Sequence, residues 1–406
     1  MMYFNSIRLP ALALAWMAAL LTACGGGGGE SAPAIPALTN RVSLTVDGGP
    51  ADSGYNVNRL YTDVTVCQPG STACQTIDHV LVDTGSTGLR LLSSAMAAGL
   101  NLSRVTGVSG FPLLSCVQFI DNTFAWGPVL SADIVLGQKT AASVPIQLIA
   151  DPSFGSPAAS CSIGGVAMTT AEGLGANGIL GIGLFKDDCG ADCTATSHNG
   201  SYYTCTDASC RRTIGAVVST AKQLKNPVPL FAQDNNGVLI DLPAVAADGA
   251  VSLTGSLVFG IGTQSNNQFT SGQLLRTTAL GDFTTELLGK SYTTSFLDTG
   301  SNGIYFDSGF FKCTDGSVGF YCPASFTSLS AVLVGTNAQR SAVSFAIDNA
   351  TALFVDSSKT VLPTLSGPLG DATSFDWGLP FFYGRRVFIG IEGQVSPLGT
   401  GPLHAF

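Results

Sequence analysis

The chain has 406 residues, a formal net charge of −9, 49 glycines and only 11% charged residues. That length is enough for one large or two medium domains with real cores, and the sparse charge favours a β protein over long charged helices. The acidic balance leaves no basic stripe to neutralise phosphates, so we expect no nucleic-acid partner.

The first 23 residues are typical of an export signal. Arg8 carries the positive charge, and residues 9–20 form an apolar run that is too short for a confident membrane span. Residues 21–24, Leu-Thr-Ala-Cys, resemble a bacterial lipobox, in which Cys24 is lipidated after the signal peptide, residues 1–23, is removed. A plain signal peptide that is cut near Ala23 is the alternative.

The lipidated Cys24 opens a stretch that is expected to stay unfolded. Five consecutive glycines and a run of Pro and Ala predict that residues 24–40 form a flexible tether. Acylated Cys24 makes the lipid bilayer an expected partner. The expected location is the bacterial cell envelope, lipid-anchored at the outer membrane on its periplasmic or surface face.

Short apolar–polar alternations broken by Gly, Asn and Pro predict a mostly antiparallel β fold, with strands at residues 42–46, 63–66, 132–136 and 256–259. Helices are predicted only at residues 93–100 and 213–224. A boundary near residues 226–231 predicts an N-terminal lobe, residues 41–228, and a C-terminal lobe, residues 229–406.

Ten cysteines besides Cys24 predict disulfide bonds, because an even number in an exported chain fits an oxidising compartment. Two pairs are close enough to staple hairpins, Cys67 with Cys74 and Cys313 with Cys322, and Cys116 with Cys161 is the expected long-range pair. The spacings around His198 match no zinc finger or ribbon, so two disulfides are favoured over a zinc site for the remaining four, Cys189, Cys193, Cys205 and Cys210.

The tetrapeptide Asp-Thr-Gly-Ser occurs twice, at residues 83–86 and 298–301. Each copy follows a short apolar run, and each continues with a similar strand pattern. A single copy would be ordinary turn chemistry. Two copies in matching surroundings predict a duplicated lobe, whose pseudo-twofold axis would bring Asp83 and Asp298 together.

Paired carboxyls suit the hydrolysis of a peptide bond by water. Two carboxyls about 3 Å apart cannot both ionise cheaply, so they share a proton and serve as base and acid together. We therefore expect Asp83 and Asp298 to be catalytic, with no metal and no organic cofactor. Thr84 and Thr299 would hydrogen-bond across the two loops. Gly85 and Gly300 would bring backbone N–H groups to the carboxyls, and Ser86 and Ser301 would bond their outer oxygens.

The two motifs resemble those of the pepsin-like aspartic proteases. Residues 177–183 resemble the segment that packs beside the first active-site loop, residues 255–260 the start of the second lobe's core, and residues 377–382 with 386–390 its closing strands. The signal, tether and cysteines are also similar to those of a bacterial lipoprotein branch of that superfamily. The resemblance implies a mostly β, bilobal fold of two antiparallel β-rich lobes related by a pseudo-twofold axis, with few short helices.

The chain departs from that family above the dyad. In the family, a Tyr on a hairpin flap covers the dyad and bonds to a Trp seven residues after the first Asp. Here that position is Arg90, and the flap-equivalent stretch, residues 119–129, has no Tyr. Phe124 and Trp126 are the aromatic residues available for flap and substrate contacts. Arg90 either faces the carboxylates and lowers their pKa, or is a solvated or supporting residue.

These features predict an aspartic endopeptidase, a monomer that binds an extended peptide or protein substrate across a cleft. The altered flap leaves a catalytically inactive peptide-binding or scaffold lipoprotein of the cell envelope as the alternative. A serine hydrolase is disfavoured, because the chain has only three His and no Gly-x-Ser-x-Gly. Neither His-Glu-x-x-His nor a P-loop is present to indicate a metalloprotease or a nucleotide site.

Overall fold

The computed structural model describes residues 39–107 and 110–406. The signal peptide, Cys24 and nearly all of the tether lie outside the described residues, so their predicted roles stay predictions. None of the helices in the described part of the chain is long and apolar enough to cross a membrane.

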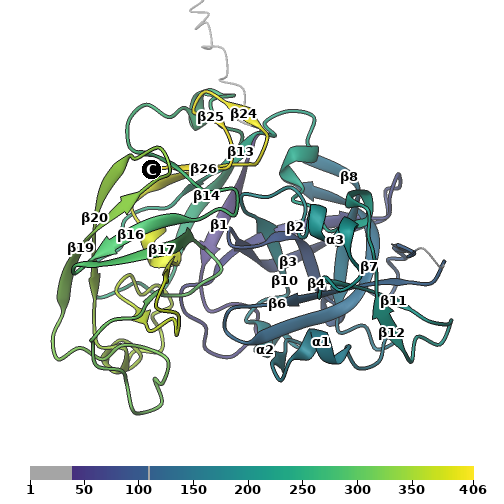
Figure 1. Cartoon of the computed structure of the whole chain (residues 1–406), viewed down its shortest axis with the longest axis horizontal. Helices are drawn as coiled ribbons and strands as arrows, with labels where there is room; N and C mark the ends of the chain where they lie inside the picture. Colours follow the sequence, from purple (N-terminus) through teal and green to yellow (C-terminus); the bar gives the residue numbers. More distant parts are fainter. Residues whose placement is uncertain (1–38, 108–109) are drawn as a thin grey trace, which may run out of the picture. The chain divides into compact units, whose positions relative to one another are not determined.

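Strands dominate the described residues, which confirms the mostly β fold (Figure 1). Seventeen of them form one hydrogen-bonded network: β1 Arg41–Val46, β2 Leu60–Cys67, β3 Cys74–Asp83, β4 Thr87–Leu92, β5 Ser103–Arg104, β6 Leu113–Gln118, β7 Thr123–Leu136, β8 Lys139–Ile149, β9 Val166–Ala167, β10 Gly178–Ile182, β11 Tyr202–Cys205, β12 Thr213–Gly215, β13 Gly237–Asp241, β14 Leu253–Phe259, β15 Leu274–Arg276, β23 Arg386–Gly390 and β26 Leu403–Ala405.

A second sheet surrounds the second motif. In the described residues it has seven strands, in the order β20-β19-β16-β17-β22-β18-β21: β16 Phe283–Leu287, β17 Lys290–Leu297, β18 Ile304–Phe306, β19 Thr327–Val334, β20 Arg340–Ile347, β21 Ser366–Gly367 and β22 Ser374–Trp377. A small hairpin joins β24 Val395–Ser396 to β25 Gly399–Thr400. The α-helices are short: α1 Ala159–Ser162, α2 Ala171–Leu174, α3 Ala191–Ala195 and α4 Ala350–Leu353.

All four predicted strands are confirmed, since they lie within β1, β2, β7 and β14. Both predicted helices are wrong. Residues 93–100 contain one 3₁₀ turn, Ser93–Ala95, because an eight-residue segment with a glycine cannot sustain a helix alone. Residues 213–224 contain β12 and the 3₁₀ turn Thr220–Lys222; the β-branched start of this segment pairs with β11 instead of coiling.

The two parts of the chain that carry the motifs are tied together by β1. This strand pairs with β14 along its whole length, from Arg41↔Val258 to Val46↔Leu253, and the two lie side by side in Figure 1. β14 continues through β13 to β23. Strands from before the first motif and from after it therefore share one hydrogen-bonded framework.

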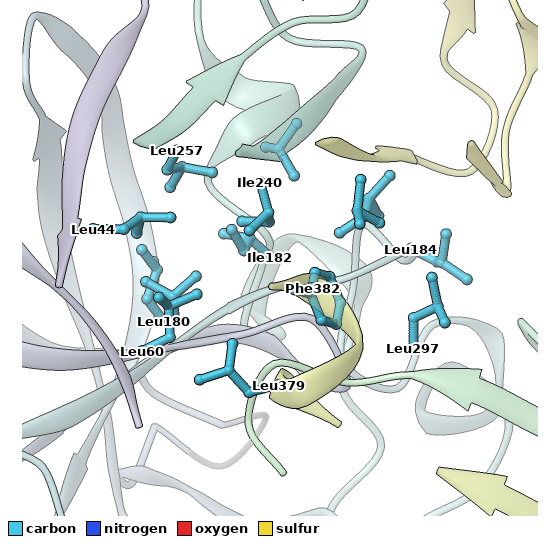
Figure 2. Packing of buried hydrophobic residues seen from close by; sticks show 14 of the residues in the cluster. Leu44, Leu60, Leu180, Ile182, Leu184, Ile240, Leu257, Leu297, Leu379 and Phe382 are labelled. Atoms are coloured by element: carbon cyan, nitrogen blue, oxygen red, sulfur yellow. The ribbon is translucent and has the colours of Figure 1, made fainter. Parts of the chain in front are cut away.

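A buried apolar cluster fills the space between these strands (Figure 2). It takes Leu60 from β2 and Leu180 from β10, together with Ile240 from β13 and Leu297 at the end of β17. Each fully buried Leu or Ile side chain contributes about 1.5–3 kcal/mol. Because Leu180 and Leu297 stand directly beside the two motif loops, the same core that stabilises the fold also fixes these loops.

All the predicted disulfides are present in the described residues, and they join Cys67 to Cys74, Cys116 to Cys161, Cys189 to Cys193, Cys205 to Cys210, and Cys313 to Cys322. The cysteines around His198 are thus paired with each other, as the spacing argument favoured. The Cys116–Cys161 bond matters most for the site, because it fastens β6 to α1.

Candidate active site

The two motifs stand in the same arrangement of three strands. β3 runs into the first motif, β4 leaves it, and β10 lies between them, parallel to β3 and antiparallel to β4. In the second motif β17, β18 and β22 repeat this pattern. The strands match residue for residue, since Leu180 pairs with Val82 and Trp377 pairs with Leu297, each just before the Asp. Each Asp is therefore placed at the end of a buried strand, in a turn braced from below.

Thr84 and Thr299 cross-link the two turns. The backbone N–H of Thr84 donates to Oγ1 of Thr299 at 3.1 Å, and the N–H of Thr299 donates to Oγ1 of Thr84 at 3.0 Å. Each hydroxyl also donates to a carbonyl of the opposite strand, that of Leu297 at 3.1 Å for Thr84 and that of Val82 at 2.6 Å for Thr299. Four buried hydrogen bonds thus lock the turns to each other, as the sequence predicted for these threonines.

The two carboxyls receive matching hydrogen bonds. The N–H of Gly85 donates to Oδ1 of Asp83 at 2.8 Å, and Ser86 Oγ donates to its Oδ2 at 2.5 Å. In the second turn Gly300 and Ser301 bond Asp298 in the same way, at 2.7 and 2.9 Å; each Asp thus has one oxygen on a glycine N–H and one on a serine hydroxyl.

The glycines leave room for the opposing carboxyl. A Cβ on Gly85 would lie 2.7 Å from Cγ of Asp298, and a Cβ on Gly300 would lie 2.8 Å from Oδ1 of Asp83. No carbon atom fits at such distances without moving the neighbour. The turns must therefore carry glycine for the two acids to approach each other.

The carboxyls influence each other's proton. Burial, the charge of Asp298 and a hydrogen bond between the two acids raise the pKa of Asp83 far above its ordinary value of 3.8, and the bonds from Ser86 and Gly85 only partly oppose this. Two acids that approach so closely hold one proton between them at neutral pH. The site therefore contains an acid and a base side by side.

A pocket of about 720 Å³ opens above the pair. Its lining includes both motifs and the tip of the hairpin formed by β6 and β7, which contributes Phe119, Ile120 and Asp121. The tip closes with a bond from the N–H of Phe119 to the carbonyl of Thr123. The disulfide of Cys116, midway along the paired strands, fastens the hairpin to α1. A hairpin thus borders the site, as expected, but with different residues at its tip.

The predicted flap residues Phe124 and Trp126 do not line this pocket, and their assignment to flap and substrate contacts is corrected accordingly. Both are buried in a separate apolar cluster with the Cys116–Cys161 disulfide, and the Trp126 ring packs edge-on against Tyr203. They follow the turn on β7, where alternate side chains face this cluster. Their role is to stabilise the hairpin from behind.

Arg90 lines the pocket, but its charge is used elsewhere. It is 2% exposed, and its Nη2 pairs with Oδ2 of Asp188 at 3.2 Å while its Nη1 donates to Oε1 of Gln147 at 2.8 Å. Gln147 in turn donates to the backbone carbonyl of Ser115 in β6 at 2.6 Å. Of the two expected roles, the supporting one matches this geometry: Arg90 holds the hairpin strand and is neutralised by Asp188.

Three of the pocket residues that were not anticipated from the sequence bear on the site. Ile120 is 61% exposed at the hairpin tip, while Tyr305 and Asp376 lie beside the second motif. Superposing the two motif copies would have found Tyr305, because it follows Asp298 by the seven residues that separate Arg90 from Asp83. No local pattern marks Asp376. Among residues 39–107 and 110–406 no group of three or more His, Cys, Asp or Glu side chains is arranged to hold a metal ion.

The chain is similar to an aspartic proteinase from Irpex lacteus, whose crystal structure aligns with a TM-score of 0.48 and 15% identity over 90% of this chain and 96% of that one. A search of curated proteins finds no match. A family model described as "Protein of unknown function (DUF3443)" matches residues 36–406, so the chain belongs to that family.

Proposed function

We propose that this chain is an aspartic endopeptidase, which hydrolyses extended peptides with Asp83 and Asp298 as one acid–base unit. The observation that carries the proposal is the pairing of the two carboxyls, each fixed by a glycine N–H and a serine hydroxyl and each in contact with the opposite turn. A structural Asx turn would need none of these cross-contacts.

The chemistry follows from one shared proton. The ionised carboxyl takes a proton from a water molecule as its oxygen bonds to the peptide carbonyl carbon, and the protonated carboxyl gives its proton to the carbonyl oxygen. The resulting diol collapses as the C–N bond breaks. One carboxyl gives its proton to the leaving nitrogen, and a diol hydroxyl returns a proton to the other carboxylate as the C=O bond re-forms. One water is consumed, and the pair returns to its starting state with one proton.

The pocket supports an extended peptide as the substrate. Its lining combines the two motif turns with the hairpin tip around a volume of about 720 Å³. Apolar side chains stand exposed at its rim, with Ile120 on one side and Leu280, 80% exposed, on another. Such residues would bury substrate side chains at about 25 cal/mol per Å² of apolar surface.

We place the enzyme in the bacterial cell envelope, anchored to a bilayer through acylated Cys24 and working as a monomer on peptide or protein substrates. The support is the lipobox-like sequence of residues 21–24 and the even cysteine number of the mature chain. Labelling of cells with an alkyne fatty acid would test it: label should be incorporated in the full chain and be absent from Cys24→Ser.

Purified protein offered a peptide library from pH 3 to 7 tests the activity. We expect cleavage of extended peptides that is blocked by a statine-type inhibitor such as pepstatin. The matched control is Asp298→Asn, which should fold, melt at a similar temperature and leave the library intact. Peptide binding without cleavage by the wild type would instead support the catalytically inactive peptide-binding alternative.

A further inference from the structure

A third carboxyl lies next to the pair. Asp376 is on β22, where it is paired with Phe296 of β17 and with Tyr305 of β18, between the strand that enters the second motif and the strand that leaves it. It is completely buried and lines the same pocket as Asp298 and Ser301. Neither of its carboxyl oxygens has a hydrogen-bond partner among the described residues. A buried acid without a partner needs a physical explanation.

The first half of the site has no such group. In the matching three-strand arrangement, the residue of β10 that faces Arg90 is Ile179, and the residue of β22 that faces Tyr305 is Asp376. Ile179 is an ordinary buried apolar residue at 2% exposure. The acid is thus an addition to the second half, placed where the first half shows that an apolar side chain packs well.

The groups facing Asp376 favour its neutral form. Asp298 and Asp83 carry one negative charge between them, and Tyr305 is a half-buried phenol whose pKa is raised, so that it stays neutral. Arg59, a cation that lines the same pocket, donates to the carbonyl of Gly300 at 3.1 Å and forms no ion pair with Asp376. Burial above all, and then the charge of Asp298, raise the pKa of Asp376 well above its ordinary value.

Protonation also resolves the missing hydrogen bond. Ser301 gives its single hydroxyl proton to Asp298 Oδ2 at 2.9 Å. A bond from the same hydroxyl would favour the ionised form of Asp376, but one proton cannot serve both acids, and neither Asp376 oxygen has a partner. A protonated Asp376 has an O–H, and the Ser301 oxygen keeps lone pairs to accept it. A hydrogen-bonded chain from Asp376 through Ser301 to Asp298 therefore gives each hydroxyl an acceptor.

We propose that Asp376 is a positioning residue of the dyad, which stays protonated and donates a hydrogen bond to Ser301 so that the Ser301 proton is held on Asp298. The proposal rests on the proposed function and assigns the two acids different tasks. Asp298, which receives this extended chain, is the ionised acid that takes the proton from water. Asp83 keeps the shared proton and gives it to the carbonyl oxygen, so one proton enters the pair and one leaves it.

Two substitutions separate this role from a structural one. Asp376→Asn keeps a donor for Ser301 but cannot ionise, whereas Asp376→Ile copies Ile179 and removes the donor. We expect Asp376→Asn to retain kcat within about threefold, and Asp376→Ile to lose about tenfold in kcat with little change in KM. The pH at which the pair loses its first proton should rise in Asp376→Ile and stay unchanged in Asp376→Asn.

A decrease in the pH at which the pair loses its first proton, in both variants, would overturn the proposal. If Asp376 were ionised in the working range, either substitution would remove a negative charge, and both would lower the pH at which the pair loses its first proton. Equal losses of kcat in the two variants would also contradict it. Should Asp376→Ile not fold, the unchanged pH profile expected of Asp376→Asn still decides between the two cases.

Carboxyl titration by NMR needs no cleavage and keeps this test separate from the proposed function. In protein with ¹³C-labelled Asp carboxyls, a protonated signal in addition to that of Asp83 should persist through neutral pH, and it should disappear in Asp376→Asn. If the signal that Asp376→Asn removes titrates like that of an exposed Asp, the proposal is overturned. A protein that shows the protonated signal but cleaves no peptide would contradict the endopeptidase and not the state of Asp376.

Discussion

The turn after β3 and the turn after β17 carry the same four residues and hold them with the same hydrogen bonds, yet they stand on different supports. Beside the first, Arg90 faces Ile179; beside the second, Tyr305 faces Asp376. Arg90 reaches the hairpin through Gln147, while Tyr305 donates to its own turn at Asn302. The two halves of the site are therefore symmetric within the turns themselves, and they differ in the residues that pack beside each turn.

The largest expected effect concerns the support of the first turn. Arg90→Met leaves Asp188 as a buried carboxyl without its cation, so we expect a loss of about 3–5 kcal/mol in the free energy of unfolding, measured with urea. Restoring neutrality with Asp188→Asn in the same chain should recover part of the loss. A matched control is Arg340→Met, which breaks the exposed pair with Glu286 and should barely change the melting temperature. Equal losses in the two single variants would refute a special role for Arg90.

The next effect concerns the contact between the turns. Gly300→Ala places a methyl group 2.8 Å from Oδ1 of Asp83, so the carboxyl must move, and we expect at least a hundredfold loss in kcat/KM. Gly309→Ala is the matched control, because a Cβ there meets nothing within 4 Å. Cleavage assays on both variants test this. Full activity in Gly300→Ala would mean that the close approach of the two acids is not needed.

A smaller effect is expected from the threonine cross-links. Thr84→Val keeps the shape but leaves the N–H of Thr299 without its acceptor, which costs about 1–3 kcal/mol in stability. Thr299→Val should cost a similar amount because its bonds mirror those of Thr84. Since both act in one network, the double variant should lose less than the sum of the two. Strict additivity in urea unfolding would show that the turns are held independently.

The smallest effect, taken over one pH unit, is a pH dependence of stability. Because the pKa of Asp83 is raised in the folded protein, its stabilising contribution is fully present below the ordinary value of 3.8 and is lost as the pH rises from there toward the folded pKa. Wild type should therefore lose stability relative to Asp83→Asn above that pH, by at most about 1.4 kcal/mol per pH unit for one proton. Melting curves from pH 3 to 8 measure this. Parallel curves for the two proteins would show that Asp83 titrates as an exposed acid does.

Local patterns revealed much of this molecule before its structure. The period-two strands, the cysteine pairs and the repeated Asp-Thr-Gly-Ser all depend on neighbours in the sequence, and each is found where it was expected. The two predicted helices failed because pairing with β11 and a short, glycine-containing segment overrode a weak helical preference. Arg90 could not be assigned, since its partner Asp188 is brought to it only by folding. Phe124 and Trp126 were misassigned because aromatic character does not tell which side of a hairpin is buried.

Cleavage by the two single Asn variants and by the double Asn variant shows whether Asp83 and Asp298 work as one unit. Residues that act as a unit are not additive, so we expect each single substitution to reduce kcat by about a thousandfold or more and the double variant to be no worse. All three should melt cooperatively. Substantial cleavage by either single variant, or a kcat of the double variant far below that of both single variants, would show that the two acids do not work as one unit.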